Sequence, residues 1–293
     1  MPHFELREFG LESDFWIKLF KNEKIDRVGF EEKYLSLFQL KYLKNQAKIK
    51  FLSTRDLVEN LRAVKDSSEI KHLKKAAQIT DLAFDYIFKN ISSGQSEKEI
   101  SWELEKCMRQ AGASKNAWES LIVAVGEHSS MAHYLSGETK IKKRDLVLLD
   151  FGCVFEGYHS DMTRVIFLGT PNTKEVQIYN HVLQAQETGI GLLKAGVSGE
   201  LVDKKVREKL EGFNKFSYRH GLGHGVGLEV HELPRLNSLS KEKLVSGNVV
   251  TVEPGIYEPH WGGVRIEDMV LVGEKRSETL TKSAKKLSEI TKN

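Results

Sequence analysis

The strongest constraint on this chain is a weak repeat within its own sequence. At an offset of 102 positions, Gly94 aligns with Gly196 and Ser96 aligns with Ser198. Apolar residues at helical spacing lie on both sides of each aligned pair, and they predict one helix before and one helix after each glycine. A chance match of two amphipathic helix pairs would give the same alignment. The repeat gains weight from the acidic residues downstream of each helix pair.

Four carboxylates occupy matched places after the two helix pairs. Asp150 ends an apolar strand pattern and Asp161 interrupts the next, while Glu253 and Glu267 hold these places in the second half. Glycine-rich turns separate the two members of each pair, so each predicted hairpin brings its two acids side by side. Taken singly, each acid would be an exposed strand-end residue. Taken together, four close carboxylates would raise one another's pKa values unless divalent cations lay between them, so the pattern predicts a metal pair.

The helices of the first half carry recognisable start signals. Ser68 is the expected N-cap of the first helix, and Ser96 with Glu99 forms the capping-box pattern of the second. Upstream of these helices the pattern is mixed. Residues 28–30 and 49–52 are the candidates for short strands there.

A glycine-rich stretch places three histidines within twelve positions, namely His220, His224 and His231. The glycines between them oppose a helix, so an extended or looped backbone is predicted. Alternation along such a backbone places His220 and His224 on the same side, where glycine lets a ligand approach closely. The stretch matches neither the GxGxxG dinucleotide motif nor the HExxH zinc motif. A single histidine more often packs or lies at the surface, but three in this setting favour a functional site.

Composition excludes several classes of function. The chain has 44 Lys and Arg against 41 Asp and Glu, and the two signs are interspersed, so no nucleic acid partner is expected. No apolar run approaches the roughly 18 residues of a membrane span, so no membrane partner is expected either. The two cysteines, Cys107 and Cys153, form no metal or disulfide motif, and a cytoplasmic location is expected.

Six motifs, taken together, indicate one family. They are DFG at 150–152, GYHSDMTR at 157–164, HGLGH at 220–224, HELP at 231–234, EPGIY at 253–257 and GGVRIED at 262–268. On these motifs the chain resembles the proline-peptidase branch of the pita-bread (M24) metallopeptidases, the family of Xaa-Pro aminopeptidases and prolidases. The resemblance covers about residues 62–282.

The resemblance implies an α+β fold of the pita-bread (creatinase/aminopeptidase-like) type. In that fold, pseudo-twofold repeated helix-helix-hairpin units surround a curved antiparallel sheet. Two regions are expected on the same grounds. Residues 1–62 form a truncated, short N-terminal region, and residues 63–293 form the pita-bread metallopeptidase catalytic domain.

The resemblance also assigns roles to individual residues. It places the family's five metal ligands on Asp150, Asp161, His224, Glu253 and Glu267. It places substrate-binding and proton-handling roles on His133, His220, His231, Glu253 and Arg265. Two divalent ions are implied, with manganese as the first choice and cobalt, zinc or iron as alternatives, because an oxygen-rich site with one imidazole suits all four.

The implied reaction is hydrolysis of the bond between an N-terminal residue and a following proline. The nucleophile would be a hydroxide that bridges two ions about 3.5 Å apart, and the partner would be a peptide with proline at its second position. A homodimer is possible in such a family. Two alternatives stay open at this point: a methionine aminopeptidase, which shares the ligand set, and a pita-bread domain that binds peptides without catalysis.

Overall fold

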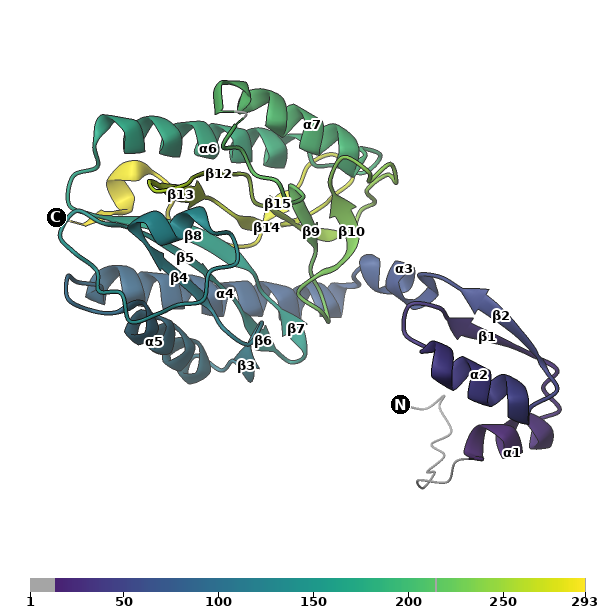
Figure 1. Ribbon diagram of the computed structural model, residues 1–293. Coiled ribbons are helices and arrows are strands. Elements are labelled where there is room, and N and C mark those ends of the chain that lie inside the picture. Colours follow the sequence, from purple (N-terminus) through teal and green to yellow (C-terminus); the bar gives the residue numbers. More distant parts are fainter. Residues whose placement is uncertain (1–13, 214, 293) are drawn as a thin grey trace. The chain divides into compact units, whose positions relative to one another are not determined.

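The computed structural model describes residues 14–213 and 215–292 (Figure 1). The chain divides into two compact units between Asn60 and Leu61. None of the helices in the described residues combines the length and the apolar character that a membrane span requires.

The smaller unit is built from alternating helices and strands. Its elements are α1 (Phe15–Asn22), β1 (Arg27–Glu31), α2 (Leu37–Gln46) and β2 (Lys50–Thr54). The two candidate strands of this region are therefore present, and they pair in parallel. Ile17, Phe20 and Ala47 form a small hydrophobic core of their own.

The larger unit begins with the first predicted helix pair. Helix α3 (Leu57–Ala63) spans the division between the units, and the pair consists of α4 (Ser67–Asn90) and α5 (Glu97–Gln110). The predicted N-cap of α4 is wrong by two positions, because the cap is Asp66 rather than Ser68. The Asp66 carboxylate accepts hydrogen bonds from the backbone N–H groups of Ser68 and Glu69, and a carboxylate also suits the positive end of the helix dipole. The capping box of Ser96 and Glu99 at the start of α5 is confirmed.

The second helix pair repeats the backbone geometry of the first. It consists of α6 (Thr173–Leu192) and α7 (Gly199–Lys209). Gly94 and Gly196 both adopt positive φ, at 98° and 87°, a conformation that favours glycine. Ser96 and Ser198 cap the helices that follow, and each also forms an isolated antiparallel β-bridge, to Lys140 and Lys243 respectively. The sequence repeat is thus a structural repeat.

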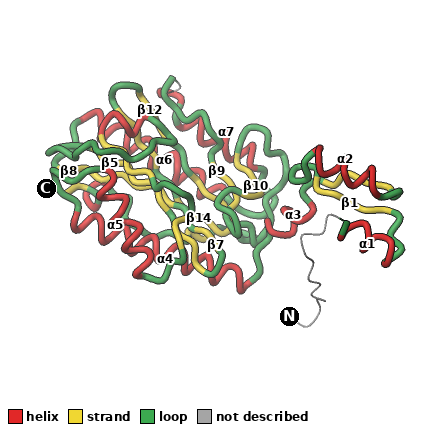
Figure 2. The backbone as a smooth tube through the Cα atoms, turned by 60° about the horizontal axis from the view of Figure 1, so that its bottom comes forward, coloured by secondary structure: helices red, strands yellow, loops and turns green. Residues whose placement is uncertain are grey.

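The strands of the larger unit lie between the two helix pairs. They are β3 (Lys115–Asn116), β4 (Ile122–Val125), β5 (Leu146–Phe151), β6 (Cys153–Phe155), β7 (Tyr158–His159), β8 (Met162–Leu168), β9 (Gly223–Gly225), β10 (Glu232–Leu236), β11 (Val249–Val252), β12 (Gly255–Glu258), β13 (Gly262–Arg265), β14 (Asp268–Leu271), β15 (Glu278–Thr279) and β16 (Thr291–Lys292). A 3₁₀ helix, η1 (Gly126–Ser130), follows β4. Figure 1 shows α4 and α5 on one side of these strands and α6 and α7 on the other, and Figure 2 shows the same arrangement from a second direction.

Two main sheets carry the predicted hairpins. One has the strand order β16-β8-β5-β4 and the other the order β10-β9-β11-β14-β15, while β12 and β13 form a separate hairpin. Within these sheets every pairing is antiparallel except that of β16 with β8. Strand β5 pairs with β8, and β11 pairs with β14, so each half closes the hairpin that the positions of its acids predicted.

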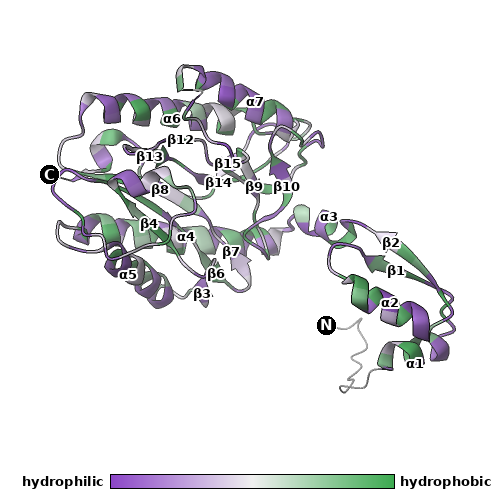
Figure 3. Ribbon diagram, viewed as in Figure 1, coloured by the Kyte–Doolittle hydropathy of each residue, from purple (hydrophilic) through white to green (hydrophobic). Residues whose placement is uncertain are grey.

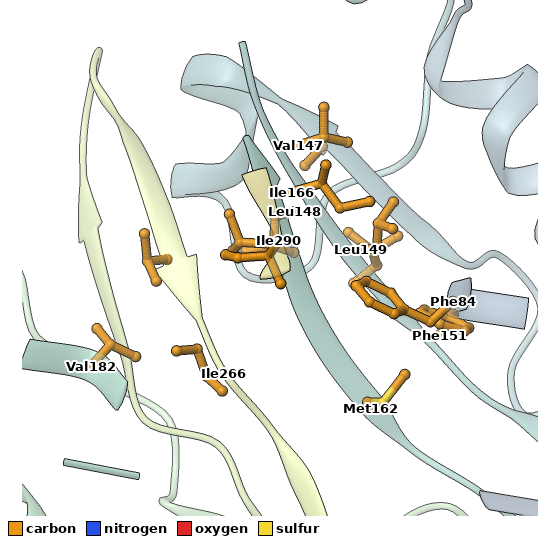
Figure 4. Close-up of a cluster of buried hydrophobic side chains, with 14 of the residues drawn as sticks. Phe84, Val147, Leu148, Leu149, Phe151, Met162, Ile166, Val182, Ile266 and Ile290 are labelled. Atoms are coloured by element: carbon orange, nitrogen blue, oxygen red, sulfur yellow. The ribbon is translucent and has the colours of Figure 1, made fainter. Parts of the chain in front are cut away.

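One large hydrophobic core joins the two halves. Strands β4 and β5 are hydrophobic, whereas the outer helices α5 and α7 carry many hydrophilic residues (Figure 3). Phe84 of α4, Val147 of β5, Val182 of α6 and Ile266 all belong to the same buried cluster (Figure 4). Because side chains of both helix pairs belong to this one cluster, the two hairpins are packed on a shared core.

A buried ion pair adds a second link between the halves. Arg164 of β8 and Asp268 of β14 are fully buried, with Nη2 and Oδ1 2.6 Å apart. A second guanidinium nitrogen of Arg164 donates to the backbone carbonyl of Glu267 at 2.6 Å. This hydrogen bond holds Glu267 in place directly before β14.

Candidate metal and catalytic centre

The two aspartates of the first half lie at the connected end of the hairpin, where β5 ends and β8 begins. Asp150 pairs with Thr163 across the ladder, and Asp161 directly precedes β8. Gly152 allows this closeness, because a Cβ at that position would lie 1.9 Å from the carbonyl oxygen of Ser160. Any other residue there would push the two strands apart.

The second half contributes its donors from three neighbouring strands. Glu253 directly follows β11, Glu267 lies between β13 and β14, and His224 is the middle residue of β9. Gly223 brings β9 against β11, since a Cβ there would lie 2.0 Å from the carbonyl oxygen of Thr251. The predicted extended backbone around His224 is therefore present.

The five predicted ligands lie around one cavity. His224 Nε2 lies 3.4 Å from Glu253 Oε1 and 3.6 Å from Asp161 Oδ2. One donor atom each from Asp161, His224 and Glu267 lies within 4.8 Å of the other two, and all three residues are buried. Asp150 and Glu253 line the same cavity, which has a volume of about 540 Å³.

The protonation equilibria show how unfavourable this group of acids is without a cation. Burial, followed by the neighbouring carboxylates, raises the pKa values of Asp161 and Glu253 well above their ordinary range. Burial and Asp150 raise the pKa of Glu267 to about 8. Burial lowers the pKa of His224 to about 3, so its ring is neutral and can offer a lone pair. A buried set of four carboxylates and one neutral imidazole fits divalent cations, because added positive charge would remove the repulsion.

Arg265 holds the edge of this acidic group. Its guanidinium group contacts Asp150 Oδ2 at 2.5 Å, the Tyr257 hydroxyl at 2.9 Å and the Thr163 hydroxyl at 2.9 Å. Thr163 in turn donates to Glu267 at 2.6 Å. The guanidinium group of Arg265 thereby orients Asp150 of the first half directly and Glu267 of the second half through Thr163.

Three predicted histidines line the cavity around the acids. His220 Nε2 lies 3.0 Å from the Tyr257 hydroxyl, and burial together with the nearby Arg265 lowers the pKa of His220 to about 4. The ring of His231 lies 4.3 Å from that of His224. His133 reaches the cavity from the segment after η1. His133 and His231 are both exposed, so a ligand in the cavity can reach them.

His231 is followed by a buried acid with two cationic partners. The Glu232 side chain is 2% exposed, and its oxygens contact Lys65 Nζ at 2.7 Å and Arg62 at 2.6 Å. Burial lowers the pKa of Lys65, although Glu232 opposes that effect. These contacts fix the start of β10 and hence the residue before it.

All nine predicted site residues therefore line one cavity, although their individual roles stay predictions. The lining also includes residues that sequence reasoning missed, among them Trp118, Arg235 and Asn237. No local motif singles these residues out, because they reach the cavity only through the packing of β4, β9 and β10. Tyr257 and Thr163 lie inside recognised motifs, but their hydrogen bonds to Arg265 could not be read from spacing.

Comparison with known proteins gives an independent view of the same chain. The sequence pattern of metallopeptidase family M24 matches residues 71–274. A relative from Pyrococcus horikoshii, named Xaa-Pro dipeptidase, is 36% identical over 98% of this chain and 84% of its own length.

Solved structures agree with the sequence comparison. An Xaa-Pro dipeptidase from Bacillus anthracis superposes with a TM-score of 0.91 at 43% identity, covering 95% of this chain and 78% of that one. An X-Pro aminopeptidase from Thermotoga maritima gives a TM-score of 0.88 at 36% identity, with coverage of 97% and 81%. The α+β pita-bread fold predicted from the sequence is thereby confirmed. All three relatives are named for Xaa-Pro bonds, which does not favour the methionine aminopeptidase alternative.

Proposed function

The chain belongs to metallopeptidase family M24, and we propose that it hydrolyses the peptide bond between an N-terminal residue and a following proline. The observation that carries this proposal is the convergence of five metal-type donors with three histidines and one arginine in a single cavity. The names of the relatives support proline as the residue after the cleaved bond.

Two divalent ions are the cofactors that this donor set suits. Asp150, Asp161, His224, Glu253 and Glu267 would hold them, with His224 contributing Nε2, because Nδ1 lies 3.1 Å from the carbonyl oxygen of Gly225. Carboxylate-rich sites favour harder ions, so manganese is the first choice, ahead of cobalt, iron and zinc. Bound ions would supply an activated water and polarise the carbonyl group of the peptide.

The protein's own side chains complete the reaction. A carboxylate oxygen of Glu253 accepts a proton as the water oxygen attacks the carbonyl carbon. When the C–N bond breaks, that proton passes to the proline nitrogen, which leaves as a secondary amine. His133 and His231 donate hydrogen bonds to the oxygen that becomes negatively charged, an effect worth a few kcal/mol in related chemistry.

The cavity also limits what can bind. A volume of about 540 Å³ lies within the range of small-molecule sites and fits a short peptide rather than a folded protein. Arg235 lines the cavity as an exposed cation, and a cation there would attract the free carboxylate of a dipeptide. We therefore place Xaa-Pro dipeptides ahead of longer Xaa-Pro peptides as substrates.

Three further assignments are part of this proposal. Catalysis belongs to the larger unit, since every predicted site residue lies in it. The cytoplasm is the expected location. A homodimer is the expected assembly, to be tested by light scattering of the purified protein.

A substrate panel tests the proposed function. Purified protein would be stripped of metal, reloaded with Mn, Co or Zn, and assayed on Xaa-Pro dipeptides, on longer Xaa-Pro peptides and on Met-Ala as the control. We expect metal-dependent cleavage of Xaa-Pro dipeptides and little cleavage of Met-Ala. Preferred cleavage of Met-Ala, or cleavage that chelation does not change, would contradict the proposal.

A further inference from the structure

The segment that carries His133 has a support which the proposed mechanism does not use. This segment, here called the His133 loop (residues 126–137), includes η1 and leads away from β4. The His133 ring is exposed, and among the described residues it has no hydrogen-bonding partner of its own. Its direction into the cavity must therefore be set by the backbone on either side.

Glu97 contacts that backbone at several points. It lies in the first turn of α5 and is completely buried. Its Oε1 accepts a hydrogen bond from the backbone N–H of Val125 at 2.9 Å and lies 2.8 Å from His128 Nδ1. Its Oε2 accepts hydrogen bonds from the Tyr134 hydroxyl at 2.8 Å and from the backbone N–H of Gly137 at 2.9 Å.

These four contacts lie before, within and at the end of the His133 loop. Val125 is the residue before the loop, and Gly137 is its last residue. His128 and Tyr134 also contact each other, because their rings stack with centroids 4.5 Å apart. Tyr134 is the direct neighbour of His133, so one carboxylate controls both the span of the loop and the residue beside the histidine.

The chemistry of Glu97 argues against an incidental contact. A buried carboxylate is costly unless hydrogen bonds or opposite charges compensate it. In the described part of the chain neither Lys nor Arg forms an ion pair with Glu97, and His128 is its one potentially charged partner. Burial and Glu97 raise the pKa of Tyr134 to about 12, so the hydroxyl keeps the proton that it donates.

From this arrangement we infer that Glu97 is a positioning residue, which holds His133 toward the peptide that occupies the cavity. The inference rests on the proposed function only in so far as His133 acts on a bound peptide. Glu97 itself lies outside the cavity lining and touches neither the substrate nor the metal donors.

A double-mutant cycle tests the inference. The variants are Glu97→Gln and His133→Ala, alone and combined, with His220→Ala as the matched background from the other half. In Glu97→Gln the new amide group meets two donors, so the loop loses its fixed span while the side chain keeps its size. We expect kcat for an Xaa-Pro dipeptide to fall by about 10-fold or more, with KM changing by less than about 3-fold.

The backgrounds distinguish positioning from general stability. In the His133→Ala background, Glu97→Gln should lower kcat by less than about 2-fold. In the His220→Ala background it should lower kcat as much as it does in the wild-type protein. An equal loss in both backgrounds would overturn the inference, as would a His133→Ala variant with unchanged kcat. Tyr134→Phe keeps the test open should Glu97→Gln not fold, and it should show the same pattern with a loss of about 3-fold.

A second measurement does not depend on turnover. In the manganese-free protein with histidine labelled by ¹³C, Glu97→Gln should shift or broaden the ring signal of His133 and leave that of His231 unchanged. Unchanged His133 signals would overturn the inference even if the protein proves to be a peptidase. If instead the wild-type protein cleaves no Xaa-Pro peptide, the proposed function fails while a shifted His133 signal still supports the role of Glu97.

Discussion

The two halves of the repeat support their cavity histidines by related but different means. In the first half, Glu97 of α5 accepts hydrogen bonds from the Tyr134 hydroxyl and from the backbone N–H of Gly137, and among the described residues it pairs with neither Lys nor Arg. In the second half, Asp203 of α7 accepts a hydrogen bond from the Tyr218 hydroxyl at 3.1 Å, and it also pairs with Arg207 at 2.9 Å. Both halves thus connect an acid of the second helix, through a tyrosine, to a segment that carries a histidine.

The two halves differ in whether the support reaches the histidine ring or only the backbone beside it. Arg207 donates to the backbone carbonyls of Tyr218 and His220 at 2.8 and 3.0 Å. The ring of His220 also has Tyr257 as a direct partner. In residues 14–213 and 215–292 the His133 ring has no hydrogen-bonding partner, so its support acts through the backbone, whereas His220 is held by its ring as well. The two supports occupy different positions of the repeat, because Glu97 aligns with Gly199 at the offset of 102, and the histidine ring itself has a hydrogen-bonding partner in the second half.

The largest effect should come from removing one donor acid from each half. In Asp161→Asn and Glu267→Gln we expect Xaa-Pro hydrolysis to fall by about 10³-fold or more, because each change takes a charged ligand from the shared site. Manganese should no longer raise the melting temperature of either variant, and that temperature without metal should not fall, since repulsion among the acids is relieved. The exposed Glu138→Gln is the control. Normal activity in one of these variants would mean that the acid replaced in it is not a ligand of the metal site.

The next effect concerns the link between the halves. Replacing Asp268 by Asn leaves Arg164 buried without its charged partner, and we expect a loss of about 3 kcal/mol in the free energy of unfolding. The exposed pair of Lys98 and Glu138 provides the comparison, and Glu138→Gln should change stability by less than about 1 kcal/mol. Urea unfolding of the three proteins measures this. If Asp268→Asn and Glu138→Gln lowered the free energy of unfolding equally, the buried ion pair would not stabilise the link between the halves.

The stability of the metal-free protein should depend on pH. The folded-state pKa of Glu267 is about 8 against an ordinary 4.5, so the folded protein keeps a proton that the unfolded chain has released. Stability therefore falls as pH rises from about 4.5 to 8. His220 and His224 act in the opposite sense, but only below pH 6.5.

Between pH 6.5 and 8 the carboxyl effect acts without the opposing histidine effect. We expect the free energy of unfolding in the presence of a chelator to fall by about 1 kcal/mol per pH unit there. Saturating manganese should remove this slope, and Glu267→Gln should reduce it. A flat profile for the chelated wild-type protein would show that the acids are not as close as the structure places them.

The smallest effect compares the two tyrosines. Tyr134→Phe leaves Glu97 Oε2 with Gly137 alone, so we expect about a 3-fold loss in kcat. Tyr218→Phe leaves Asp203 paired with Arg207, so we expect less than about a 2-fold loss. Steady-state kinetics on one Xaa-Pro dipeptide measures both. The reverse order would contradict the difference drawn between the halves.

The sequence predicted those parts of the molecule whose signal is local. Acids that interrupt apolar strands, such as Asp150, stand out because a buried charge needs a partner, and the Ser96 capping box depends on residues three positions apart. Glu97 comes directly after Ser96, yet it resembles any acid in a first helical turn. Its role depends on contacts with residues 28 to 40 positions away, which no local pattern encodes.

The misplaced helix start has a similar explanation. Asp66 and Ser68 are both good N-cap residues, but Ser68 has no capping partner three residues later. Asp66 has that partner in Glu69, and the reciprocal hydrogen bonds decide between the two. Arg235 was missed for a different reason, because only the pairing of β10 with β9 brings it to the cavity.

The most direct test of the central claim is anomalous diffraction from crystals grown with manganese. If the two halves build one metal centre, the map will show two peaks among the carboxylates of Asp150, Asp161, Glu253 and Glu267, with one peak beside His224 Nε2. Peaks confined to other parts of the chain, or the lack of any peak at these side chains under saturating manganese, would contradict the account.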